Sequence, residues 1–262
     1  MKDPRNPFNY PLNPNFGKGI YRRAIRLEQH DGYVSGDLED CNHGFQVKLY
    51  HNGQQITAVT GEARRIPFTT CHQAIDPLQS LVGMPLGLSA YELIKRVDPR
   101  ANCTHWLDLA LLALVHAARG NEPVREYRVD VPDEDDKPTL VTVQRNGEKV
   151  LEWQVQEWVV QAPAHLANKT LFRGFARWAN DVLADEDEKE AAFVLQKGYF
   201  VSRARRFDTN SMAGESANAH QTMFDACFTY SEPQRSVATR TANTAYDFSN
   251  TPEQLLRFVE AK

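Results

Sequence analysis

Alternating apolar and polar positions predict β-hairpins in two separate stretches of the chain. In the first stretch, "GFQVKLYH" and "QQITAVTGEA" flank Asn52-Gly53, a dipeptide that readily adopts the two positive φ angles of a type I′ turn. In the second stretch, "TLVTVQR" and "EKVLEWQVQ" flank Asn146-Gly147 in the same way. We therefore expect antiparallel strands in both stretches, with one face of each sheet buried.

A long apolar helix is expected between the two stretches. In "CTHWLDLALLALVHA", residues 103–117, apolar residues recur at helical spacing and also fill the opposite side, which is typical of a helix at the centre of a fold. Ser89 and Glu92 have the spacing of a capping box. Later helical patterns cover "LFRGFARWANDVL" and "EKEAAFVLQKGYF", whereas "YFVSRAR" and "ACFTYS" have strand-like composition.

The order of these elements predicts an α+β fold. Strands, helices, strands and helices follow one another without the regular alternation of βαβ units, which disfavours a doubly wound parallel sheet. We expect antiparallel sheets with segregated helices, arranged as two strand-rich lobes around the central apolar helix. Residues 1–120 would form an N-terminal arm, a sheet and a helical segment, and residues 121–262 a second segment of strands and helices; the pattern also allows a single domain.

Composition and charge exclude several classes of protein. Of the 262 residues, 42% are hydrophobic and 24% are charged, as in globular proteins, and the net charge of −4 gives no general nucleic-acid-binding surface. No apolar run is long enough for a membrane-spanning helix, and the first residues lack the apolar core of a signal peptide. Four cysteines are too few for a disulfide scaffold, so we expect free thiols and a cytoplasmic location. No nucleotide-binding motif occurs, so no nucleotide cofactor is expected.

Cysteine and histidine residues gather at the predicted starts of helices. Cys103 and His105 lie at the start of the apolar helix, and Cys71 follows an apparent strand exit in "FTTCHQAIDP". A thiol at a helix N-terminus faces unpaired N–H groups, which lower its pKa. With His43, these residues form a set of two thiols and two imidazoles that suits zinc or iron. We therefore take His43, Cys71, Cys103 and His105 as candidate metal ligands, and Cys71, Cys103 and His105 also as candidate catalytic groups; buried cysteines and a capping histidine are the alternative.

Two segments resemble a known family. "RIPFTTCHQAIDPLQSLVGMPLG", residues 65–87, followed by "CTHWLDLALLAL", residues 103–114, resembles the bacterial domain-of-unknown-function family 2889, with Trp106 where that family usually has Leu. The resemblance implies a cytoplasmic bacterial protein and supplies no established reaction. Its motif positions fall on His43, Cys71, Cys103 and His105. A fainter similarity, to iron–sulfur scaffold proteins, would require Cys41 with Asp40 as the first part of the cysteine pattern.

The leading functional hypothesis is a soluble bacterial catabolic enzyme that acts on a small carbonyl or carboxylate compound, including aromatic ones. A bound zinc or iron would polarise the carbonyl or activate water in lyase or hydrolase chemistry, and Arg203 or Arg205 would hold a substrate carboxylate. Two alternatives stay open: an iron–sulfur or metal-binding accessory protein without catalysis, and a metal-free enzyme with a cysteine nucleophile. The expected partner is a small-molecule substrate rather than nucleic acid or membrane, and a homodimer is compatible with the sequence.

Overall fold

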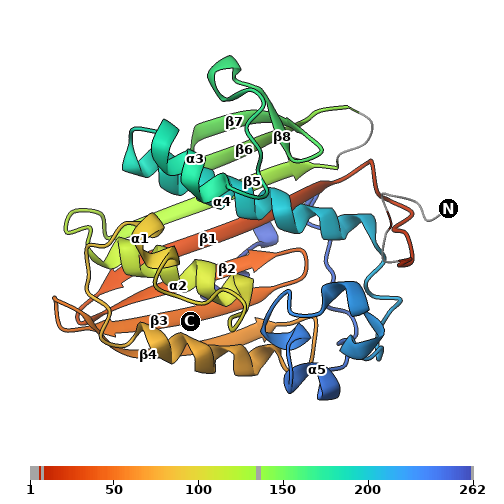
Figure 1. Cartoon of the computed structure of the whole chain (residues 1–262), viewed down its shortest axis with the longest axis horizontal. Coiled ribbons are helices and arrows are strands. Elements are labelled where there is room, and N and C mark those ends of the chain that lie inside the picture. Colours follow the sequence, from red (N-terminus) through yellow and green to blue (C-terminus); the bar gives the residue numbers. More distant parts are fainter. Residues whose placement is uncertain (1–5, 7–8, 134–136, 261–262) are drawn as a thin grey trace.

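A single antiparallel sheet organises the α+β fold. The computed structural model describes residues 6, 9–133 and 137–260. Within this part of the chain the sheet has eight strands: β1 (Ile20–His30), β2 (Tyr33–Asp40), β3 (Gly44–His51), β4 (Ile56–Arg65), β5 (Val124–Pro132), β6 (Thr139–Arg145), β7 (Glu148–Gln156) and β8 (Val159–Ala162). They are hydrogen-bonded in the order β4-β3-β2-β1-β5-β6-β7-β8 (Figure 1). The predicted fold class is confirmed.

The two strand-rich stretches are the two halves of this sheet. They join where β1 pairs antiparallel with β5, with Ile25 opposite Tyr127. Both Asn-Gly dipeptides connect neighbouring strands as expected, and Asn146 and Gly147 have the predicted positive φ angles, 51° and 85°. At Asn52-Gly53 only Gly53 has a positive φ, 85°, and the connection from His51 to Ile56 is longer than the predicted two-residue turn. Residues 1–120 and 121–262 are therefore linked by a continuous ladder of backbone hydrogen bonds.

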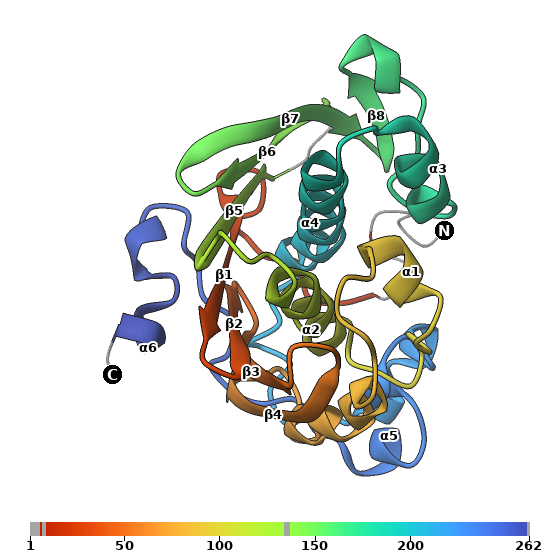
Figure 2. The same cartoon turned by 90° about the vertical axis from the view of Figure 1, so that its left-hand side faces the viewer.

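Two long helices cover one face of the sheet. They are α2 (Thr104–Ala117), which packs on β1, β2 and β3, and α4 (Glu186–Ser202), which packs on β5, β6 and β7. Figure 2 shows both helices on the same side of the curved sheet, with the C-terminal helix α6 (Arg257–Glu260) on the other side. The helix at 103–117 is confirmed as central, because residues from Trp106 to Leu114 are buried with only Asp108 partly accessible. No helix in the described part of the chain combines the length and apolar content that crossing a membrane requires.

The remaining helical elements are short. The α-helices are α1 (Ala90–Ile94), α3 (Phe175–Val182) and α5 (Gln234–Val237). The 3₁₀ segments are η1 (Cys71–Leu81), η2 (Ala164–Leu166), η3 (Arg203–Arg206), η4 (Ala217–Ala219), η5 (Gln221–Met223), η6 (Phe228–Tyr230) and η7 (Pro252–Gln254). Ser89 and Glu92 form the predicted capping box at the start of α1.

Each half of the sheet repeats the same order of elements. Four antiparallel strands are followed by a 3₁₀ segment, a short α-helix and a long α-helix: β1–β4, η1, α1 and α2, then β5–β8, η2, α3 and α4. The strand order is symmetric about the β1–β5 pair. The halves are therefore related by an approximate two-fold arrangement, which lets equivalent positions be compared below.

Two segments expected to be strands are helical. "YFVSRAR" forms the end of α4 and η3, and "ACFTYS" contains η6. In α4 the buried positions Ala191, Leu195 and Tyr199 recur every four residues, so the helical period of the preceding segment continues through the strand-like composition.

The C-terminal segment lies on the face of the sheet opposite α2 and α4 (Figure 2). The backbone N–H of Leu256 donates to Glu39 Oε2 over 2.6 Å, and the N–H of Tyr246 donates to the carbonyl of Cys41 over 2.7 Å. The N-terminal arm runs beside residues 206–208, where the N–H of Asn13 donates to the carbonyl of Arg206 over 2.9 Å. Residues 1–5 and 7–8 of the expected arm lie outside the described residues.

Candidate metal centre

Asp40, His43 and His105 meet where β2 ends and α2 begins. Asp40 is the last residue of β2, His43 lies in the short turn to β3, and His105 is the second residue of α2. One potential ligand atom from each residue lies within 4.8 Å of the other two. The packing of α2 on β2 and β3 brings the two histidines together across 62 residues of sequence.

Asp40 is fully buried and accepts hydrogen bonds at both carboxylate oxygens. Oδ1 accepts from the backbone N–H groups of Asn42 (2.9 Å) and His43 (3.0 Å), and it lies 2.9 Å from His43 Nδ1. Oδ2 accepts from Tyr21 Oη and Arg23 Nη2, both over 2.9 Å. Asp40 therefore fixes the turn that carries His43 as well as the His43 ring.

The electrostatic surroundings keep Asp40 ionised. Burial alone would raise the pKa of this carboxyl, but the charge of His43, the close approach of His105, the hydrogen bond with His43 and the charge of Arg23 together lower its pKa well below the usual range. Burial and the neighbouring His43 lower the pKa of His105 to about 3, so its imidazole is neutral at physiological pH. A carboxylate beside a neutral imidazole is the protonation state that a divalent metal requires.

The two imidazoles stack instead of pointing at a common centre. Their ring centroids lie 3.6 Å apart with an angle of 26° between the planes, and His105 Nε2 is buried without a hydrogen-bond partner, 3.5 Å from Asp40 Oδ2. A metal ion lies close to the plane of each imidazole that binds it. The rings must therefore tilt apart before both can bind one ion, and although each side chain is 12% exposed, the Nε2 atom of His105 is itself buried.

The equivalent position in the second half of the fold is closed by ion pairs. Arg23 on β1 corresponds to Arg125 on β5, and both side chains are buried. His105 and Asp108 are the second and fifth residues of α2, and Asp187 and Glu190 hold these positions in α4. Arg125 Nη1 contacts Asp187 Oδ1 at 2.7 Å and Glu190 Oε1 at 3.0 Å.

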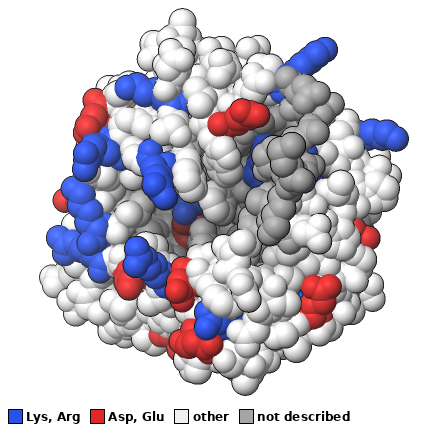
Figure 3. All heavy atoms as spheres, turned by 45° about the vertical axis from the view of Figure 1, so that its right-hand side comes forward, with Lys and Arg blue, Asp and Glu red and all other residues white. Residues whose placement is uncertain are grey.

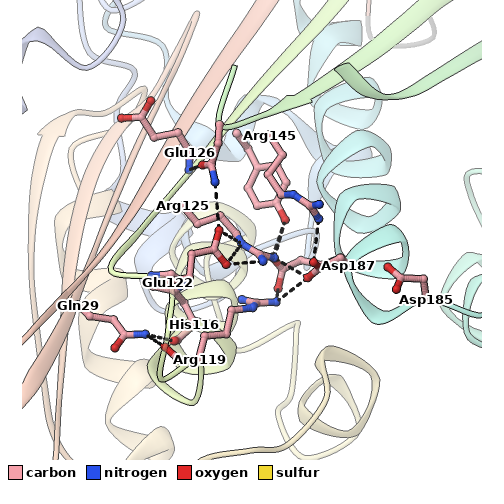
Figure 4. Close-up of polar contacts among 12 residues, drawn as sticks. Gln29, His116, Arg119, Glu122, Arg125, Glu126, Arg145, Asp185 and Asp187 are labelled. Carbon is pink, nitrogen blue, oxygen red and sulfur yellow. Dashed lines mark hydrogen bonds and ion pairs between the residues drawn. The ribbon is translucent and has the colours of Figure 1, made fainter. Parts of the chain in front are cut away.

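Further arginines complete this closed network. Arg119 Nη2 lies 2.8 Å from Glu190 Oε2, and Arg145 Nη1 lies 3.1 Å from Asp187 Oδ2, so that arginines and carboxylates interlock beside the start of α4 (Figure 4). In the first half, by contrast, Asp108 Oδ1 lies 3.2 Å from Lys197 while its Oδ2 is buried without a hydrogen bond. Among the described residues, the group of three possible metal ligands lies in the first half, and this difference locates the candidate site there.

The two predicted cysteine ligands are not part of the cluster. Cys103 lies at the start of α2 as expected, at the N-cap position but without a side-chain capping hydrogen bond, and its side chain is buried in the main apolar core. Cys71 begins η1 and packs in a separate apolar cluster with Phe68 and Tyr230, where its Sγ lies 3.3 Å from Thr229 Oγ1. Among the described residues, no sulfur lies in a group of three ligand atoms of this kind. His43 and His105 are brought together as predicted, whereas Cys71 and Cys103 are not brought to them.

The expectation of a lowered thiol pKa is wrong. Burial raises the pKa of Cys103 well above its usual value, despite the helix N-terminus, and raises the pKa of Cys71 to about 11. The free-energy penalty of placing a thiolate in apolar surroundings exceeds the stabilisation that the helix end supplies. The cysteine-nucleophile alternative therefore loses its main physical support.

Iodoacetamide should label Cys71 and Cys103 slowly in the native protein near neutral pH. The reacting species is the thiolate, and a pKa of about 11 for Cys71 reduces its thiolate fraction roughly 100-fold below that of an ordinary thiol. Mass spectrometry of timed samples measures the rate at each cysteine, with protein unfolded in urea as the reference. Faster labelling of either cysteine in the native protein than in urea would restore the nucleophile hypothesis.

The predicted substrate-binding arginines are engaged within the protein. Arg205 is buried, its Nε donates to Asp133 Oδ1 over 2.8 Å and its Nη1 to Asp247 Oδ1 over 3.0 Å. Arg203 stacks its guanidinium over the Trp158 ring at 5.8 Å. Arg205 therefore joins the β5–β6 loop to the C-terminal segment and has no capacity left for a substrate carboxylate.

Asp40 is the member of the site that the sequence patterns did not identify as a ligand. The sequence feature that could have identified it is the Asp-x-x-His spacing of Asp40 and His43 at the end of a predicted strand, where a tight turn brings the two side chains together.

Comparison with protein-family models gives no match for this sequence, and comparison with curated proteins gives none either.

Proposed function

We propose that the protein binds one divalent transition-metal ion, zinc or iron, through His43 and His105 with Asp40 in support. The observation that carries the proposal is the convergence of two imidazoles, each with a side chain that is 12% exposed, on a buried, ionised carboxylate. A carboxylate that hydrogen-bonds a metal-binding histidine orients its ring and raises its basicity. Because Asp40 Oδ1 contacts His43 Nδ1, the Nε2 atom of His43 is the nitrogen left for the metal.

The chemistry that such an ion supplies agrees with the leading hypothesis from the sequence. Two protein nitrogens leave coordination positions for water and substrate, as in catalytic rather than structural sites. A bound metal would polarise a carbonyl or lower the pKa of water, which are the steps of a lyase or hydrolase that acts on a small carbonyl or carboxylate compound. The resemblance to family 2889 and the four free cysteines are consistent with a cytoplasmic bacterial protein of this kind.

Metal binding by purified protein tests the proposal directly. After treatment with a chelator, the protein should bind about one equivalent of Zn²⁺ in isothermal titration calorimetry, and His43→Gln and His105→Gln should each weaken binding at least about 100-fold. Co²⁺ offers a spectroscopic readout. Its spectrum should lack the sulfur-to-cobalt charge-transfer band, because Cys71 and Cys103 lie outside the cluster.

Matched variants separate the site from general effects. His51→Gln removes a histidine at the far end of β3 and should leave affinity unchanged, as should Cys103→Ser. Absence of stoichiometric binding, or equal affinity in His105→Gln and His51→Gln, would show that the proposal is wrong. A strong sulfur-to-cobalt charge-transfer band would show that a cysteine thiolate binds the metal.

A second candidate function follows from the same contact. Asp40 Oδ1 and His43 Nδ1, 2.9 Å apart, form a carboxylate–imidazole pair of the kind that orients a general base. This function requires no metal, so protein that binds neither Zn²⁺ nor Co²⁺ but loses a substrate turnover in His43→Gln would favour it.

A further inference from the structure

Basic residues are concentrated in two segments that are distant in sequence. The segments 158–180 and 196–207 contain seven Lys and Arg residues and no Asp or Glu, although the whole chain has a net charge of −4. On the face in view in Figure 3, Lys and Arg side chains gather along the left side, with a few Asp and Glu side chains among them. Segregation of this kind creates a local positive potential that the net charge conceals.

Part of this charge is not neutralised by the fold. Lys197 pairs with Asp108, and Arg205 with Asp133 and Asp247. In contrast, Lys169, Arg173 and Arg177 form no ion pair with the described residues, and Arg173 and Arg177 are exposed. The surface formed by these segments therefore stays positive.

Aromatic side chains are exposed beside these cations. Phe172 is 51% exposed and Phe200 is 43% exposed, and their ring centroids lie 5.4 and 5.6 Å from that of Trp158. The Arg173 guanidinium lies 5.9 Å from the Phe172 ring, and that of Arg203 lies over Trp158. We call Trp158, Phe172, Phe200, Arg173 and Arg203 the Trp158 surface.

The backbone that carries Trp158 is strained. Glu157 and Trp158 form the turn between β7 and β8 with φ angles of 45° and 72°. The preceding turn of the same meander uses Asn146-Gly147 for similar angles, which is the favoured choice. A left-handed conformation is unfavourable for a residue with a Cβ, so the turn holds Trp158 against its backbone preference.

We propose that the Trp158 surface binds an acidic segment of a partner protein that carries an aromatic or aliphatic side chain. Trp and Arg dominate the residues that contribute most to binding at protein interfaces. The exposed rings supply contact area for the apolar side chain, and Arg173, which is exposed and forms no ion pair with the described residues, supplies charge complementary to the acidic residues. A negatively charged chain with three clustered rings fits a short peptide better than a long polyanion such as nucleic acid.

Fluorescence anisotropy with the full chain tests this surface. The probe is a fluorescein-labelled dodecapeptide of Glu and Asp with one Phe and one Leu, and the comparison peptide has Ser at those two positions. We expect the first peptide to bind at least about tenfold more tightly, and Phe172→Ser and Phe200→Ser each to weaken it at least about fivefold. Arg173→Gln should weaken binding and reduce its dependence on salt.

The control variant is Val237→Ser, which removes an apolar side chain that is 70% exposed outside the Trp158 surface. It should bind the peptide like the unaltered protein, and circular dichroism should show that all four variants are folded. Equal affinity for the two peptides, or unchanged affinity in Phe172→Ser and Phe200→Ser, would overturn the proposal. So would tighter binding of an oligothymidylate than of the acidic peptide, or a dimer that dissociates in Phe172→Ser.

Discussion

Asp40→Asn should lower the free energy of unfolding by about 3–5 kcal/mol, more than any other conservative change considered for this protein. The substitution removes the negative charge that faces Arg23, whose side chain is 1% exposed and has no other carboxylate within ion-pairing distance among the described residues. An uncompensated guanidinium would then stay in the core. Urea unfolding monitored by circular dichroism measures the shift of the midpoint.

Asp130→Asn is the matched control for this prediction. Asp130 on β5 pairs with Arg22 on β1, but the side chain of Asp130 is 32% exposed. Its replacement should therefore lower the free energy of unfolding by less than about 1 kcal/mol. The double variant Arg23→Met with Asp40→Asn should be more stable than Asp40→Asn alone, because no isolated charge remains in the core and the Asn side-chain oxygen can still accept hydrogen bonds from the turn. If Asp40→Asn and Asp130→Asn lower the free energy of unfolding by the same amount, Asp40 does not stabilise the fold to the extent that its hydrogen bonds indicate.

The local features of the fold were accessible from the sequence because they depend on neighbouring residues. Asn52-Gly53 and Asn146-Gly147 specify turns, and the apolar pattern after Cys103 specifies a helix, whatever the rest of the chain does. The continuity of the sheet was not accessible in this way. It depends on the pairing of Ile25 with Tyr127, and no local pattern records that contact.

The candidate site was accessible only in part for the same reason. His43 and His105 stood out as potential ligands, but which groups would join them depended on the way α2 packs on β2. Cys71 and Cys103 have the composition of a metal site, and burial, which composition does not reveal, places them in apolar clusters and raises their pKa values. Asp40 was hidden because an acidic residue at the end of a strand is common, and its importance comes from Tyr21 and Arg23 on the adjacent strand.

Glu190→Gln should be the second most destabilising change, with a loss of about 3 kcal/mol. Glu190 is 3% exposed and accepts hydrogen bonds from Arg119, Arg125 and the Tyr127 hydroxyl, the last over 2.6 Å. The loss should be smaller than for Asp40→Asn, because Arg125 keeps its contacts with Glu122 and Asp187, whereas Arg23 keeps none with a carboxylate. Urea unfolding of both variants under the same conditions measures this order.

Glu186→Gln provides the comparison on the same helical turn. Glu186 pairs with Lys189 at the surface with a side chain that is 67% exposed, so its replacement should change the unfolding midpoint little. A loss in Glu190→Gln that equals or exceeds that of Asp40→Asn would mean that the arginine network, and not the Asp40 cluster, is the more sensitive of the two equivalent positions. The expected order, by contrast, follows from the difference between the halves. Several arginines and carboxylates share contacts at the start of α4, whereas a single carboxylate, Asp40, binds Arg23, Tyr21 and His43 beside the start of α2.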